Sequence, residues 1–226
     1  MTALQSLRLT RPTEALVPLA SLKSHLVVEH DEDDALITAL GEAAYEHLTG
    51  LDTPWQRVWL QERWRDYWPD FSRRPLLRMA PVIGLHRVTY INTAGIEMLI
   101  KPAACRIQRE AGGGVRVVFA EGYELPSDVA PREDAVRIDY EAGYGPEPGD
   151  VPAPVAHAVR LLVGHWYRNR EEVVVSQASP KELPMGVKAL MAPFRRIGVE
   201  AWDNPPAAQA SGSGETAVAG EAQTPD

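Results

Sequence analysis

The sequence has a single cysteine, Cys105, so no disulfide can form within the chain. This fits a reducing compartment, because disulfides persist mainly in secreted proteins. The chain also lacks a run of about 20 apolar residues, the length that a membrane-spanning helix needs. No basic start followed by an apolar stretch opens the sequence. We therefore expect a soluble protein with neither a signal peptide nor a membrane partner.

An excess of basic residues is missing as well. The chain has 23 lysines and arginines against 31 aspartates and glutamates, which gives a net charge of −8. A general nucleic-acid-binding surface needs the opposite balance, so the charge also disfavours a DNA-binding regulator. An acidic protein is compatible with DNA that passes beside it without binding, because its carboxylates repel phosphates.

Recognisable catalytic and metal-binding motifs are absent too. The six histidines follow no zinc spacing, and there is no Cys-x-x-Cys pair. No Gly-x-Ser-x-Gly elbow occurs. The triple glycine at 112–114 lacks the lysine and the serine or threonine of a phosphate loop, and lies between two strand-like runs. That position favours a hairpin turn, and we predict no catalytic residue, metal site or cofactor.

What the sequence does contain is enough apolar material for a core, at 45% of 226 residues. The longest predicted helix spans residues 150–175. Val155, Val159 and Leu162 recur there at helical spacing and predict one apolar stripe. We expect Asp150 to cap the start of this helix.

Two shorter helices are predicted earlier, where apolar residues recur at helical spacing over 19–29 and 35–48. An acidic run at 30–34 separates them, and Asp31 is the expected N-cap of the second helix. Residues 1–18 hold two prolines and show little periodicity. We interpret them as an arm.

From about residue 54 the apolar period changes from 3.6 to 2, which is typical of strands. Strands are expected over 55–64 and 135–141. Two further pairs of strand-like runs, over 88–100 and 105–119, flank short turns with glycine and predict hairpins. The middle of the chain is therefore predicted to be a small antiparallel β-domain.

A compact apolar segment follows the long helix at residues 183–196, which we name the closing segment. Its apolar residues fit one face of a short helix that Pro193 should end. The last residues are mostly Pro, Ala, Gly, Ser, Thr and acids, a composition that predicts disorder.

The predicted fold class is thus α+β. A small α-helical bundle of N- and C-terminal helices carries an inserted antiparallel β-domain and a disordered C-terminal tail. The predicted parts are an arm (1–18), a first helical part (19–53), the β-domain (54–149), a second helical part with the closing segment (150–198) and the tail (199–226).

The order of several short runs resembles one protein family. The run His165-Trp166-Tyr167-Arg168-Asn169-Arg170-Glu171, preceded by Ala142-Gly143-Tyr144-Gly145 and Val151-Pro152, resembles the head–tail connector (adaptor) proteins of tailed bacteriophages. The group is the phage gp6-like or phiE125 gp8 family, which also occurs in gene transfer agents. The resemblance covers roughly residues 19–196. Within the motif helix, it rests on His165, Trp166, Tyr167, Arg170 and Glu171.

The resemblance implies a structural protein of the particle neck and not an enzyme. Members of the family assemble as a dodecameric ring beneath the portal, extend the DNA channel and connect to the stopper or tail. The implied partners are the portal protein, a stopper or tail protein and further copies of the chain. DNA is expected to pass through without specific binding. The implied location is the neck of a virion or gene-transfer-agent particle, after synthesis in the bacterial cytoplasm.

Two interpretations of the closing segment stay open. It is expected either to anchor the chain to the portal or a neighbouring subunit, or to fold back on its own bundle. Trp166 and Tyr167 are expected in the bundle core, because they continue the apolar side of the long helix. The residues that would form the portal or subunit interface are Leu183, Met185, Val187, Leu190, Met191, Phe194, Arg195 and Arg196.

Other functions are distinguishable in principle. A stopper or tail terminator is typically smaller and mostly β, so the helical flanks argue against it. A small enzyme would be expected to show a pocket of convergent polar groups with shifted pKa values. No such set of residues is visible in the sequence.

Overall fold

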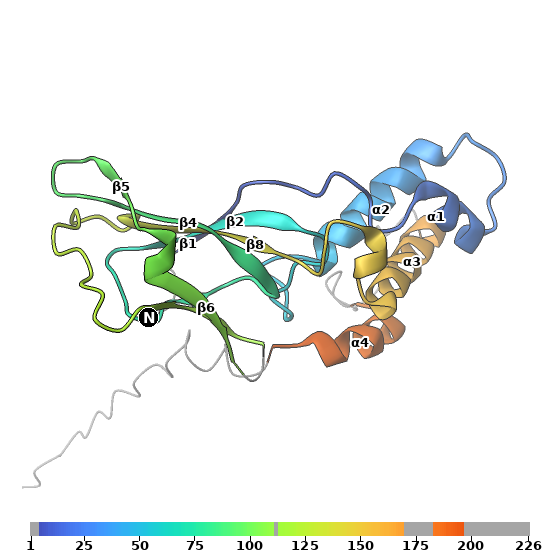
Figure 1. Cartoon of the computed structure of the whole chain (residues 1–226). Coiled ribbons are helices and arrows are strands. Elements are labelled where there is room, and N and C mark those ends of the chain that lie inside the picture. The colour runs from blue at the N-terminus through green and yellow to red at the C-terminus, as the bar shows by residue number, and fades with distance from the viewer. Residues whose placement is uncertain (1–4, 111–112, 170–182, 197–226) are drawn as a thin grey trace, which may run out of the picture.

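The computed structural model describes residues 5–110, 113–169 and 183–196 of the chain. The molecule is elongated, with all strands in a β-lobe at one end and four helices in a helical lobe at the other (Figure 1). The predicted α+β class is confirmed. The predicted disordered tail lies outside the described residues. The helices are α1 (Leu19–Leu26), α2 (Asp34–Leu48), α3 (Ala153–Arg168) and α4 (Met185–Met191).

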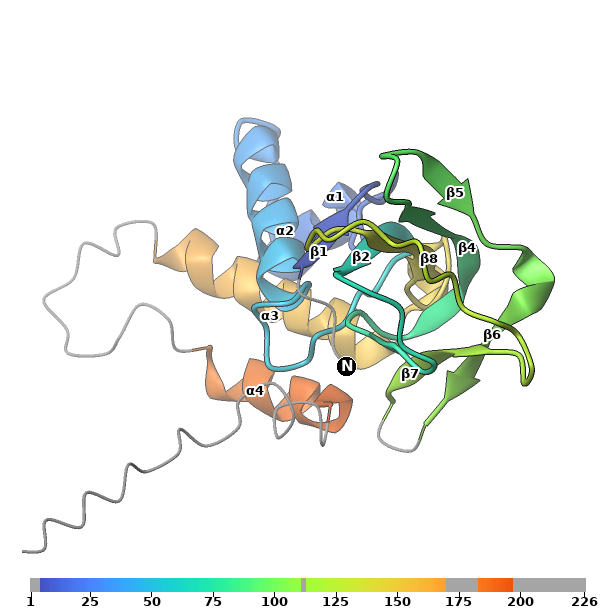
Figure 2. The same ribbon diagram turned by 90° about the vertical axis from the view of Figure 1, so that its left-hand side faces the viewer.

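The helical lobe forms around the apolar stripe of α3. This helix contacts α1, α2 and α4 (Figure 2). Val155 and Leu162 on α3 are buried with Ile37 and Leu48 on α2 in one hydrophobic cluster. At about 25 cal/mol per Å² of apolar surface, such burial is the main force that holds these helices together.

Both predicted helix caps are wrong. α3 begins at Ala153 after Pro152, while the Asp150 carboxylate accepts a 3.0 Å hydrogen bond from the Glu147 backbone N–H in a preceding 3-10 turn. α2 begins at Asp34. Asp31 lies before it, and its carboxylate pairs with Lys23 at 2.6 Å. In both places the carboxylate has a different local partner, so it does not cap the helix.

The β-lobe consists of two antiparallel sheets whose inner faces share one hydrophobic core. The five-stranded sheet has the order β1-β2-β8-β4-β5, and the three-stranded sheet has the order β3-β7-β6. The predicted hairpins β4–β5 and β6–β7 are present. The strands are β1 (Gln5–Arg8), β2 (Glu62–Trp68), β3 (Leu76–Leu77), β4 (Val82–Ile91), β5 (Glu97–Leu99), β6 (Cys105–Arg109), β7 (Val115–Phe119) and β8 (Val136–Ala142).

The strand predicted over 55–64 is wrong, because the observed strand β2 begins only at Glu62. The residues before it form a buried connection between the lobes, with isolated bridges from Arg57 to Ala80 and from Leu60 to Gly145. These residues alternate between apolar and polar because they are buried between the two lobes. The same alternation is expected for a strand with one buried face, so the sequence pattern cannot distinguish the two.

Part of the predicted N-terminal arm is extended and pairs with a sheet. Gln5–Arg8 forms β1, which pairs antiparallel with β2 along the edge of the five-stranded sheet. The pairing continues beyond the strand, where the Leu9 N–H donates to the Arg63 carbonyl at 2.7 Å. An edge strand without a clear alternation is recognisable only once its partner strand is known.

Candidate interface at the closing segment

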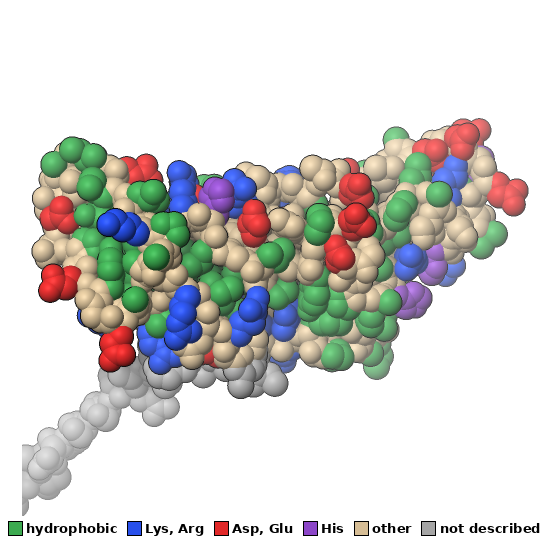
Figure 3. Space-filling view, viewed as in Figure 1, with side chains coloured by type: hydrophobic (Ala, Val, Ile, Leu, Met, Phe, Trp, Pro, Cys, Tyr) green, Lys and Arg blue, Asp and Glu red, His purple; other side chains and the backbone are tan. Residues whose placement is uncertain are grey.

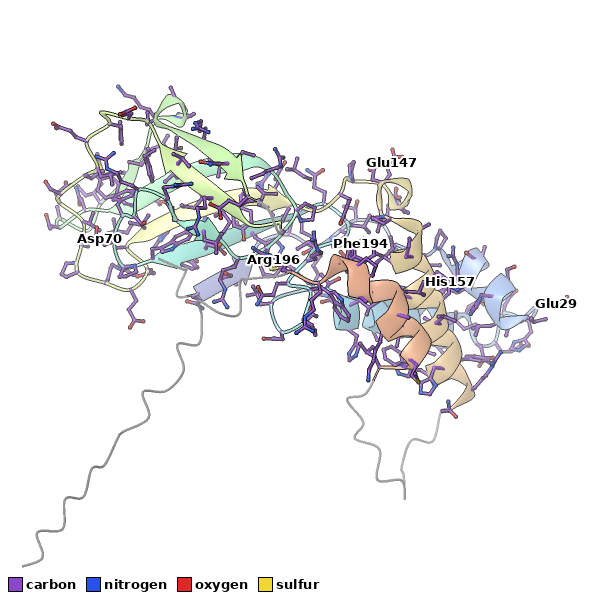
Figure 4. All side chains as sticks on the ribbon, turned by 90° about the horizontal axis from the view of Figure 1, so that it is seen from below. Glu29, Asp70, Glu147, His157, Phe194 and Arg196 are labelled. Atoms are coloured by element: carbon purple, nitrogen blue, oxygen red, sulfur yellow. The ribbon has the colours of Figure 1, made fainter. Side chains whose placement is uncertain are left out.

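The closing segment lies against its own helical bundle. Val187 and Met191 on α4 have no exposed surface and belong to the cluster that α2 and α3 form. Figure 4 shows α4 alongside α3, with Phe194 and Arg196 following toward the β-lobe. Of the two arrangements that the sequence left open, the structure therefore contains the folded-back one. Val187 and Met191 are buried within the chain and are not available to a partner. A contact with the portal stays a prediction for the side chains that point outward.

Side chains from the connection between the lobes hold this segment in place. The Trp55 indole N–H donates to the Met191 carbonyl at 2.9 Å, and the Arg57 Nε donates to the Phe194 carbonyl at 2.6 Å. The Phe194 ring meets the Trp59 ring edge to face, with centroids 5.4 Å apart. Trp55 is 136 positions from Met191 in the sequence, and Arg57 is 137 positions from Phe194. The sequence did not predict either pair. No local pattern signals such a distant pair.

The end of the segment reaches the β-lobe. The Arg196 guanidinium donates a hydrogen bond to the Arg78 carbonyl next to β3, and the residue is only 3% exposed. A cation buried this far needs polar partners, and the Arg78 carbonyl is one of them. Arg196, like Val187 and Met191, thus contributes to intrachain packing.

The outward side of the segment carries apolar groups with less contact. Met185 is 87% exposed, and Leu183 and Leu190 are half-buried. Leu183 also lines a hollow of about 770 Å³ together with Pro54 and Trp55. Arg195 is exposed beside this surface. A largely exposed methionine is a flexible apolar group suited to a protein contact.

The residues of the motif helix do not form one site. His165 is exposed, and its carbonyl accepts a 2.8 Å hydrogen bond from the Asn169 side chain. Trp166 is half-buried, with its ring edge to face against His47. Tyr167 is half-buried too, and its hydroxyl donates to the Asp33 carboxylate. The two aromatic residues thus pack at the margin of the bundle core. Arg170 and Glu171 lie outside the described residues.

A buried charged cluster joins the N-terminal strand to both lobes. The Glu62 carboxylate has no exposed side-chain surface and lies 3.0 Å from the Arg8 Nε. It also accepts hydrogen bonds from the Tyr45 hydroxyl at 3.0 Å and from the Trp64 indole at 3.1 Å. Burial raises the pKa of Glu62, and the Arg8 charge opposes that rise. Its partners come from β1, α2 and β2, so the cluster joins these three elements.

A second buried carboxylate lies inside the β-lobe. Asp66 accepts hydrogen bonds from the Arg78 backbone N–H at 2.9 Å and from the Tyr140 hydroxyl at 3.2 Å. Burial raises its pKa to about 6, although those hydrogen bonds favour the charged form. The group faces the core between the sheets and not a cleft, which indicates a structural role.

Two classes of site find no support in the described part of the chain. Among residues 5–110, 113–169 and 183–196, no three His, Cys, Asp or Glu side chains are grouped so that they could hold a metal ion. The helices described there include none that is long and apolar enough to span a membrane.

Comparison with known proteins gives structural matches alone. No family model matches the sequence, and a search of curated proteins finds no match. Two similar chains come from structures described as the neck of an empty gene transfer agent (GTA) particle with C6 symmetry and the virion of a native GTA particle. Each is 22% identical and has a TM-score of 0.67, over 87% of this chain and 97% of the other. A third, from the neck of a native GTA particle with C12 symmetry, is 21% identical with a TM-score of 0.59 over the same shares. At this level of identity the comparisons establish a shared fold.

Proposed function

We propose that the chain is a structural head–tail adaptor in the neck of a gene transfer agent or tailed-phage particle. The observation that carries this proposal is the fold shared with chains of GTA particles over 97% of their length. Because nearly the whole of those chains is matched, the likeness is to a complete subunit and not to a common supersecondary motif. The order of short runs that resembles the adaptor family supports the same function.

In this function, copies of the chain form a ring, which we propose to be a dodecamer beneath the portal. The neck structures that contain similar chains have C6 and C12 symmetry, and twelve copies are compatible with both. The ring would extend the DNA channel and connect to a stopper or tail protein. A net charge of −8 favours passage of DNA without specific binding, because carboxylates repel phosphates.

The portal contact is proposed on the outward side of the closing segment. Met185, with the half-buried Leu183 and Leu190, offers apolar surface there, and Arg195 is exposed beside it. Val187 and Met191 support this surface from below, because their side chains are buried in the bundle. The closing segment therefore has two rows of residues. The inner row fixes the segment to the bundle, and the outer row contacts the partner.

We propose a structural role without catalysis. An adaptor differs from a stopper or tail terminator in that it binds the portal. We would measure the mass of the full chain by light scattering after size exclusion, alone and with the cognate portal. A portal-bound ring is the expected result. A chain that ignores the portal but binds tail protein would indicate a terminator, and one that binds neither would contradict a role in the neck. Met185→Asp should weaken the portal complex, whereas Met98→Asp on β5, which is 40% exposed in the other lobe, is the matched control.

A further inference from the structure

Three arginines on the outer face of the five-stranded sheet each have a carboxylate partner within the chain. Arg65 and Arg87 both bind Asp139, at 2.6 Å and 2.8 Å. On the same face, the neighbouring Arg137 is 3.0 Å from Asp134. Strand pairing places Asp139 between Arg65 and Arg87, and Asp134 lies just before β8, three positions before Arg137, so each of these guanidinium groups has a carboxylate beside it.

The outer face of the three-stranded sheet is different. Arg106 on β6 pairs with Val118 on β7, and Arg116 lies two positions before Val118, opposite Gln108. Arg74, which precedes β3, donates to the Gln108 side chain at 3.4 Å. The only carboxylate bound there in the described chain is Glu110, at 2.8 Å from Arg116 and 3.5 Å from Arg74. Arg106 is exposed and has no hydrogen bond or ion pair with a described residue. We name Arg74, Arg106 and Arg116 the arginine face; three arginines and one glutamate give it a charge of +2.

This grouping is not explained by the stability of the fold. Like charges on adjacent strands repel one another, and the five-stranded sheet avoids that repulsion by pairing. Figure 3 shows basic side chains gathered along the side of the β-lobe that carries β6. Guanidinium groups bind carboxylates and phosphates through two parallel hydrogen bonds. The arginine face is therefore suited to an anionic partner outside the chain.

The same chain carries a surface of opposite charge at its other end. Glu29, Asp31 and Glu32 project from the connection between α1 and α2, and we name them the acidic corner. Lys23, 2.6 Å from Asp31, offsets one of their three charges. The Asp31 and Glu32 side chains are 88% and 82% exposed. Residues 19–53 contain eight carboxylates and one lysine. Figure 4 places Glu29 at the tip of the helical lobe, whereas the three-stranded sheet belongs to the β-lobe (Figure 1), so one copy cannot bring its own two surfaces together.

We propose that the arginine face of one copy docks against the acidic corner of the next copy in the ring. This inference rests on the proposed function, because a ring closed by rotation brings two different surfaces of each subunit into contact. The two surfaces have opposite charge and lie in different lobes, the arginine face along the side of the β-lobe and the acidic corner at the tip of the helical lobe (Figures 1 and 4). Charged groups of this kind set the register of subunits and exclude wrong arrangements.

The test is zero-length carbodiimide cross-linking of the full chain, which joins lysine to a carboxylate in direct contact. Arg106→Lys keeps the charge and should cross-link to Glu29 or Glu32. Because these residues are far apart in one copy, the product must join two copies, as a mixture of isotope-labelled and unlabelled chain will verify. The native pair of Lys23 and Asp31, which are 2.6 Å apart with the Asp31 side chain 88% exposed, is the control and should cross-link within one chain. Cross-links of position 106 to other carboxylates alone, or none between copies, would overturn the contact.

Charge reversal gives a second, independent readout. Arg106→Glu and Glu32→Arg should each reduce self-association at least about fivefold, and a chain with both changes should recover it. Unchanged association in the single variants contradicts the proposal. Duplex DNA that binds the chain and is released by Arg106→Glu, with no cross-link between copies, would assign the arginine face to nucleic acid instead. A portal-bound ring with a different cross-link pattern would contradict the proposed contact between the arginine face and the acidic corner. It would still support the adaptor function.

Discussion

The indole nitrogen of Trp55 lies 2.9 Å from the carbonyl oxygen of Met191, 136 positions later, and donates a buried hydrogen bond to it. This bond joins the connection between the lobes to the end of α4. Trp55→Phe keeps an aromatic ring but leaves the carbonyl without that donor. We expect the free energy of unfolding to fall by about 1–3 kcal/mol, the cost of a buried polar group that loses its partner. Urea unfolding followed by far-UV circular dichroism measures it.

Trp166→Phe is the matched control for this change. Trp166 is half-buried, and its ring lies edge to face against the His47 ring, a contact that phenylalanine can keep. Its cost should be clearly smaller than that of Trp55→Phe. Equal losses in both variants would mean that the lost ring volume, and not the hydrogen bond to Met191, determines the effect.

The helices and hairpins were predictable because their signals are local. An apolar stripe at helical spacing or a glycine turn between two strand-like runs is complete within about fifteen residues. The anchors of the closing segment were not predictable, since Trp55 and Arg57 bind groups more than 130 positions away. Asp139 illustrates the same limit: it alternates as an outward residue but is 2% exposed, because Arg65 and Arg87 cover it.

The N-terminal strand should be necessary for stability, because Arg8 neutralises a buried carboxylate. Arg8→Met leaves Glu62 with two neutral donors and no cation. We expect a loss of about 3–5 kcal/mol, the usual effect of removing one partner of a buried ion pair. Arg11→Met is the control, because the Arg11 side chain is 76% exposed and 3.5 Å from Glu46. A small loss for Arg8→Met would contradict the assignment of this ion pair to the stability of the chain.

Protonation of Asp66 should increase the free energy of unfolding as the pH falls into the mildly acidic range. Burial raises its pKa from 3.8 to about 6 in the folded state, so the folded chain binds the proton more tightly than the unfolded chain. Its contribution to stability therefore increases as pH falls from about 6 to 4, by an amount on the order of 1–3 kcal/mol. Asp66→Asn should remove this dependence, which unfolding at pH 7 and pH 4.5 will measure. A variant with the same pH dependence as the parent would assign the effect to another group, such as Glu62.

The inner and outer rows of the closing segment should separate stability from assembly. Met191 has no exposed surface, so Met191→Ala should lower the free energy of unfolding by about 2–5 kcal/mol. Met185 is 87% exposed, and Met185→Ala should change it by less than about 0.5 kcal/mol. Met185→Ala should nevertheless weaken the portal complex in light scattering. If it unfolds the chain as Met191→Ala does, the division into inner and outer rows is wrong.

The glycine corner after β8 should tolerate no side chain, because it brings the two lobes into direct backbone contact. Gly143 has a φ of +129°, and a Cβ there would lie 2.5 Å from the Leu60 carbonyl oxygen. Neither backbone can move without displacing Trp59, whose carbonyl accepts the Tyr144 N–H at 2.9 Å. Gly143→Ala should therefore cost at least about 1–3 kcal/mol in urea unfolding. Gly149→Ala is the control, since its Cβ would have no heavy atom within 4 Å. Equal stability of the two variants would mean that the backbones can move apart at this corner. The closing segment would then be held in place by Trp55 and Arg57 alone.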